Sequence, residues 1–170
     1  MDASLLKVVA INQLYGTNVY AVVRMAEHVS EVMCQSGTMD DVELVDEIAT
    51  LPDMKHTSFA SKFAHFFIDE ERFPIYDSYV VKMLAYHLGA QEFVRDAGNP
   101  YKAFAANFHQ LKQAAGLQCT TRELDHYLWL AGMYRKWKAK PGAHIGNEVA
   151  LLFGSHLDEI DADLKVLCGV

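Results

Sequence analysis

Hydrophobic positions recur with a helical period along nearly the whole chain of 170 residues. In the stretch 40–51, for example, Val42, Val45 and Ile48 fall on one face of a helix. Phe59, Phe63, Phe66 and Phe67 have the spacing i, i+4, i+7 and i+8, which predicts a stripe facing the core. The segments with this pattern are 4–16, 19–34, 40–51, 58–67, 79–88, 100–116, 122–140, 147–153 and 157–167.

Helix start and stop signals separate these segments. Gly16, Gly89 and Gly116 follow apolar runs and are expected to end helices. Capping boxes are predicted at Thr38 with Asp41 and at Thr120 with Glu123. No Asn-Gly or Asp-Gly turn joins two alternating runs, so strands are not expected to dominate. The sequence therefore predicts a single all-α domain over residues 1–170, an orthogonal array of about eight or nine short helices.

Composition narrows the class of protein. The net charge is −7, which argues mildly against a nucleic-acid binder but leaves room for a local basic patch. Cys34, Cys119 and Cys168 are far apart, which favours reduced thiols in a cytoplasmic protein. No apolar run approaches the ~18 residues of a membrane span. The histidines and cysteines lack the spacing of a metal site, and no cofactor motif is present.

One segment carries a resemblance to a known family, IATLPDMKHTSFASKFAHFFIDEERFPIYDSYVV, residues 48–81. Leu51-Pro52 is followed by a tight hairpin, a helix that begins around Ala60, a loop with Pro74, and Asp77 at the next helix start. This order resembles the helix-hairpin-helix DNA glycosylase superfamily. The distance from Ala60 to Asp77 is similar to that in its 8-oxoguanine glycosylase branch. The phrases SFASKF, FPIYDS and RELDHYLW also resemble an uncharacterised bacterial family.

The resemblance implies a helix-hairpin-helix glycosylase-like fold and two catalytic candidates. Asp77 takes the position of the aspartate that orients water or stabilises positive charge on the sugar. The alternative is an ordinary helix N-cap, and the two roles are compatible. In bifunctional members a lysine nucleophile stands two residues before the alanine, where this chain has Ser58. Lys62, one turn further on, is then an auxiliary cation or a shifted nucleophile, and its alternative role is a lysine that extends to solvent beside the phenylalanine face.

Nucleic-acid contacts are expected in two places. The hairpin has Asp53, Met54, Lys55 and His56 where the family has glycines that approach a phosphate, so side-chain charge would replace backbone contact. The segment YRKWKAK interleaves cations with aromatics, which is typical of nucleic-acid binding, although cations at a helix C-terminus also complement the helix dipole. The candidate nucleic-acid-binding residues are Lys55, His56, Arg135, Lys136, Trp137, Lys138 and Lys140.

Two further side-chain placements follow from helix geometry. His65 shares an edge of its helix with Lys62, and we expect a partly exposed structural histidine there or a member of a polar pocket with Asp77. Arg122 and Asp125 are three residues apart and are expected to form an ion pair.

Two functional hypotheses remain open at this level, beside the possibility of a helical protein whose resemblance to the family is accidental. The first is a glycosylase-like protein that hydrolyses the N-glycosidic bond of a base flipped out of DNA. The second is a non-catalytic helical module that binds nucleic acid or another protein, which the missing hairpin glycines and the acidic balance favour.

Overall fold

The computed structural model describes residues 2–140 and 145–155. Within this part of the chain the elements are eight α-helices, a 3₁₀ turn and a two-stranded hairpin. In order they are α1 (Asp2–Tyr15), α2 (Val22–Gln35), η1 (Ser36–Thr38), α3 (Asp41–Ala49), β1 (Thr50–Leu51), β2 (Met54–Lys55), α4 (Thr57–Phe67), α5 (Ser78–Glu92), α6 (Pro100–Ala114), α7 (Thr121–Ala139) and α8 (Asn147–Ser155).

The predicted all-α class is confirmed, and the helices lie close to the ranges that periodicity indicates. The helix expected at 157–167 lies outside the described residues. The hairpin between α3 and α4 pairs Leu51 with Met54 and Thr50 with Lys55 in antiparallel register. No described helix is both long enough and apolar enough to cross a lipid bilayer.

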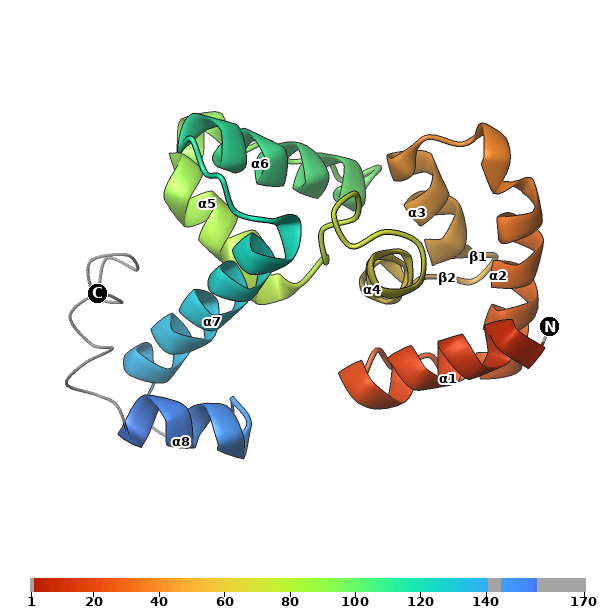
Figure 1. The fold of residues 1–170 in the computed structure, drawn as a ribbon, viewed down its shortest axis with the longest axis horizontal. Coiled ribbons are helices and arrows are strands. Elements are labelled where there is room, and N and C mark those ends of the chain that lie inside the picture. Colours follow the sequence, from red (N-terminus) through yellow and green to blue (C-terminus); the bar gives the residue numbers. More distant parts are fainter. Residues whose placement is uncertain (1, 141–144, 156–170) are drawn as a thin grey trace.

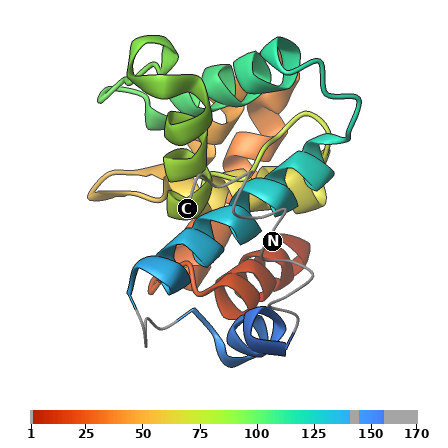
Figure 2. The same cartoon turned by 90° about the vertical axis from the view of Figure 1, so that its left-hand side faces the viewer.

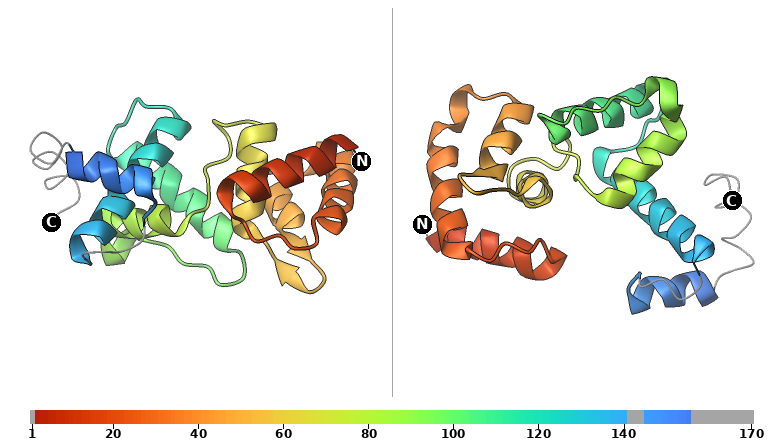
Figure 3. Two further views of the ribbon diagram at one scale, coloured as in Figure 1. Left: turned by 90° about the horizontal axis from the view of Figure 1, so that it is seen from below. Right: turned by 180° about the vertical axis from the view of Figure 1, so that it is seen from behind.

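The helices form two groups that meet along one side (Figure 1). Helices α1 to α4 pack on one another, α5 packs on α6 and α7, and the groups are joined by contacts of α3 and α4 with α6. Helix α7 crosses α5 (Figure 2), and this pair makes the most extensive helix contact in the described chain. The loop from residue 68 to residue 77 runs from one group to the other (Figure 3).

Buried apolar side chains form one cluster that runs from Val8 in α1 to Phe153 in α8. The predicted phenylalanine stripe is only half correct, because Phe59 and Phe63 are buried while Phe66 and Phe67 are 39% and 37% exposed. The last turn of α4 leaves the core. There the Phe66 ring stacks on a tyrosine of α1 with centroids 5.1 Å apart, and Lys7 Nζ lies 5.1 Å from the centre of the Phe67 ring.

Side chains cap the N-termini of α3, α5, α6 and α7. Thr120 and Glu123 form the predicted capping box at the start of α7. The predicted box at Thr38 is wrong, because Asp40 caps α3 and accepts the Glu43 N–H at 2.8 Å. Gly89 has φ of 75°, a left-handed conformation that interrupts α5 where a C-terminal cap was expected.

Gly132 allows α7 to pack closely against α5. A Cβ at this position would lie 2.8 Å from Tyr79 Cβ and 2.9 Å from the Tyr79 carbonyl oxygen. We expect Gly132→Ala to lower the free energy of unfolding by about 1–3 kcal/mol, since backbone atoms must separate. Urea unfolding measures it. Gly154→Ala in α8 is the matched control, because a Cβ there meets nothing within 4 Å and gains helix propensity. Equal effects of the two substitutions would contradict the prediction.

Candidate functional site

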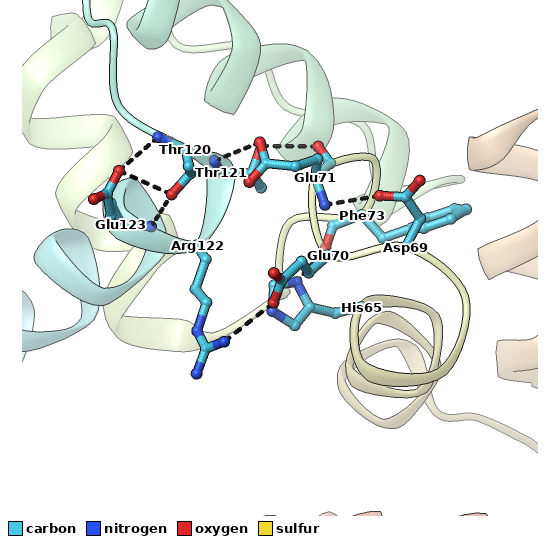
Figure 4. Close-up of polar contacts among 9 residues, drawn as sticks. All are labelled: His65, Asp69, Glu70, Glu71, Phe73, Thr120, Thr121, Arg122 and Glu123. Carbon is cyan, nitrogen blue, oxygen red and sulfur yellow. Dashed lines mark hydrogen bonds and ion pairs between the residues drawn. The ribbon is translucent and has the colours of Figure 1, made fainter.

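The loop from residue 68 to residue 77 is fastened to the start of α7 (Figure 4). A carboxylate oxygen of Glu71 accepts the Thr121 N–H at 3.0 Å, and the Glu71 carbonyl accepts the Thr121 hydroxyl at 2.8 Å. Arg122 donates to the Glu70 carboxylate at 3.2 Å. Glu71 therefore satisfies a backbone N–H that the first turn of a helix leaves without a partner, and holds the loop in place.

The far end of the loop folds back onto α4. The Tyr76 N–H donates to Ser61 Oγ at 3.0 Å, and that hydroxyl donates to the Ser58 carbonyl at 3.1 Å. The Tyr101 hydroxyl of α6 donates to the Pro74 carbonyl at 3.3 Å. The bond from Tyr76 to Ser61 holds the residues just before α5 against α4.

Asp77 lies at the N-cap of α5. Its Oδ1 accepts the Tyr79 N–H at 2.8 Å, and its backbone is extended with φ of −133°. The predicted N-cap is thus confirmed. Asp77 is half-buried, and its charge opposes the lowering of the pKa of Lys62 on α4.

Lys62 is buried, with only 7% of its surface exposed. Its Nζ donates to Ser58 Oγ at 2.8 Å. Burial lowers the pKa of Lys62, and the nearby carboxylates of Asp77 and Asp125 oppose that shift. The lysine therefore does not extend to solvent beside the phenylalanine face, and that alternative is wrong.

Asp125 is the member of the site that sequence reasoning missed. It lies on α7, is 5% exposed, and its Oδ1 has no hydrogen-bond partner among the described residues. Burial raises the pKa of Asp125 to about 7, and Asp77 adds to the shift; Lys62 and a hydrogen bond from the Ile75 N–H lower it.

The predicted ion pair between Arg122 and Asp125 is wrong, because Arg122 turns to Glu70. A helical stripe could have indicated the burial. Thr121, Asp125, Leu128 and Gly132 follow one another at steps of three or four residues, and all four are buried.

His65 contributes structure to this region. It is 3% exposed, not partly exposed as expected, and its Nδ1 lies 2.9 Å from the Phe73 carbonyl. A carbonyl only accepts, so Nδ1 carries the hydrogen. Burial lowers the pKa of His65, which keeps the ring neutral at neutral pH while it holds the loop on α4.

The hairpin residues do not join this cluster. Lys55 Nζ lies 2.6 Å from an Asp46 carboxylate oxygen, and Asp53 pairs with Arg24 of α2. His56 is half-buried, and burial lowers its pKa. The hairpin belongs to the group of α1 to α4, whereas the end of α7 lies beside α8 (Figures 1 and 3). The two predicted contact regions are therefore separate.

The predicted basic cluster at the end of α7 is partly packed between helices and partly exposed. Trp137 is half-buried. The centre of its ring lies 6.1 Å from the ring centre of Tyr134 and 5.7 Å from that of Phe153, so it packs between α7 and α8. Lys138 Nζ lies 5.5 Å from the centre of each of the Tyr134 and Trp137 rings. Lys140 is exposed at the C-cap.

Among the described residues, no three His, Cys, Asp or Glu side chains come together in a way that could hold a metal ion. His144, His156 and Cys168 lie outside the described residues. The described site offers a buried amine with two carboxylates in electrostatic range. Such an amine suits nucleophilic attack, because its lowered pKa increases the fraction that carries a free electron pair.

The site thus defines a helical protein with a buried lysine and two acids at a helix–loop–helix junction. A family model described as HI_0787_N, N-terminal domain, matches residues 1–72. The match includes Lys62 but ends before Asp77 and Asp125. The chain is also 30% identical over 132 residues to an "Uncharacterized protein" of Haemophilus influenzae, across 71% of this chain and 62% of the relative. No solved structure matches the chain.

Proposed function

We propose that this protein is a DNA glycosylase-like enzyme that releases a base flipped out of DNA. One feature carries the proposal, the buried Lys62, whose amine has a lowered pKa and is acted on by the charge of Asp77 at a helix N-terminus. The order of α3, hairpin, α4, loop and Asp77 supports it, since this is the order in the glycosylase superfamily that the sequence resembles.

In the proposed reaction the neutral Lys62 amine attacks C1′ of the sugar as the N-glycosidic bond breaks. The electron pair of that bond leaves on the base, which takes up a proton. Loss of a proton from nitrogen and opening of the sugar ring give an imine between Nζ and C1′, and water hydrolyses it to an abasic site and free amine. Asp77 stabilises the positive charge that develops on the sugar, an interaction stronger in the transition state than before it.

A cleavage assay on oligonucleotides with 8-oxoguanine, uracil or an abasic site tests the proposal. Asp77→Asn is expected to lower base release about a hundredfold or more, because the charge is lost. Asparagine caps helices as well as aspartate does, so the fold is kept. Glu92→Gln is the matched control, since it neutralises an exposed acid at the other end of α5. Full activity in Asp77→Asn would refute the role of this carboxylate.

The alternative is a non-catalytic module that binds nucleic acid or another protein. The hairpin favours it, because Lys55 is occupied by Asp46 and the glycines are missing. An intact substrate panel with retained DNA binding would support the nucleic-acid module, whereas loss of both would favour protein interaction.

A further inference from the structure

A groove lies between α5 and α7, outside the lysine–carboxylate cluster. Its volume is about 580 Å³. Side chains from both helices line it, chiefly Tyr79, Lys82 and Tyr86 from α5 and Gly132, Arg135 and Lys136 from α7. Because Gly132 lets the two backbones touch, the groove opens from the crossing point of these helices.

The walls of the groove are basic in an acidic protein. The chain carries a net charge of −7, yet the sequence has no Asp or Glu from 78 to 91 or from 126 to 140. Three cations line the groove, and neither Lys82 nor Arg135 has an ion-pair partner among the described residues. Clustered cations without acids between them create a positive potential that attracts anions.

Two tyrosines organise these cations. The Arg135 guanidinium lies 4.1 Å from the centre of the Tyr86 ring, and Lys136 Nζ donates to the Tyr79 hydroxyl at 2.9 Å. These contacts hold the charged groups at the groove without neutralising them, since a tyrosine ring or hydroxyl carries no negative charge. A guanidinium held over a ring in this way has in-plane N–H groups whose spacing matches two oxygens of a phosphate.

The groove begins next to the proposed active site. The Tyr79 N–H donates to Asp77 Oδ1, so the first lining residue is bonded directly to the proposed catalytic carboxylate. Tyr79, Lys82 and Tyr86 then follow one another along α5 at steps of three and four residues. A ligand that lies along these residues reaches the Asp77 end of the helix.

We infer that the groove between α5 and α7 binds the phosphodiester backbone of single-stranded DNA, next to the nucleotide on which Lys62 and Asp77 act. Cations alternating with aromatic rings fit a single strand, whose bases are free to stack. This inference rests on the proposed function. Of the nucleic-acid contacts that the sequence predicted on α7, it drops Trp137 and Lys138. It adds Tyr79, Lys82 and Tyr86 of α5.

Fluorescence anisotropy with the full chain tests it, using a labelled single-stranded oligonucleotide that carries an abasic-site analogue. Lys82→Ala and Arg135→Ala are each expected to weaken binding at least about threefold. Each is expected to reduce the slope of log K against log salt by about 0.7, the value for one phosphate contact on a single strand. Lys102→Ala is the matched control, because Lys102 is an exposed lysine of α6 outside the groove.

The outcomes separate the groove from the catalytic proposal. If the wild type releases bases and both groove variants bind like Lys102→Ala, the groove inference fails and the enzyme remains. If the variants weaken binding while the wild type releases no base, the groove stands as a nucleic-acid site and the enzymatic proposal fails. A wild type without salt-dependent binding overturns the groove inference. Tighter binding to the matching duplex than to the single strand overturns the assignment to a single strand.

Discussion

Lys62→Arg is expected to abolish covalent trapping of the protein on an abasic oligonucleotide in the presence of borohydride. Arginine keeps a positive charge at this buried position but does not lose its proton, so no free amine remains to form an imine. We expect the trapping rate to fall about a thousandfold or more, as when other enzymatic nucleophiles are removed. In the wild type, trapping should rise with pH through the lowered pKa of Lys62, below the ordinary range for lysine.

Two companion variants make this result specific. Lys102→Arg changes an exposed lysine and should trap like the wild type. Lys62→Met removes the charge without the width of a guanidinium, and should also fail to trap while thermal unfolding confirms that it folds. Trapping of Lys62→Arg at the wild-type rate would contradict the assignment of Lys62 as nucleophile.

Asp125→Asn is expected to raise the free energy of unfolding above pH 7 by up to about 4 kcal/mol. In the folded protein the pKa of Asp125 is about 7, whereas the pKa of an aspartate in the unfolded chain is about 4. Between these values the folded state binds more protons than the unfolded state, so stability falls as pH rises. Above pH 7 both states are ionised and the cost of burying the charge is complete. Asparagine carries no such cost.

Urea unfolding of both proteins between pH 4 and pH 8 measures this effect. The advantage of Asp125→Asn should grow up to about pH 7 and then stay constant. Glu27→Gln is the control, because Glu27 is exposed on α2 and its variant should follow the wild type. An advantage of Asp125→Asn that is the same at pH 5 and pH 8 would show that Asp125 does not titrate as described.

The fold was predictable where local signals decide it. The hydrophobic period, the helix-ending glycines and the capping box at Thr120 all depend on residues that are close in sequence. These signals predicted the helices and the start of α7. Asp77 was predictable as a cap for the same reason. Whether it also acts on a sugar stays a prediction.

The surroundings of the site depended on contacts distant in sequence. The i, i+3 rule paired Arg122 with Asp125, but Glu70 lies 52 positions from Arg122 and takes the guanidinium instead. With Arg122 turned away, Asp125 packs inward beside Lys62 and Asp77. Similarly, the stripe of phenylalanines predicted burial for Phe66, whereas this ring lies at the surface and stacks on Tyr15 of α1. Neither outcome is encoded in the segment itself.

Because the loop is bonded to α7, the site is complete only when the two groups of helices are packed together. Lys62 belongs to α4, Asp125 belongs to α7, and Glu71 connects them through Thr121, 50 positions further along the chain. Lys62 in an isolated segment of residues 1–72 would have neither carboxylate, so its amine would titrate differently from that of the whole chain. The reactivity of this lysine toward a small aldehyde would therefore report, during refolding, the moment at which the two groups dock.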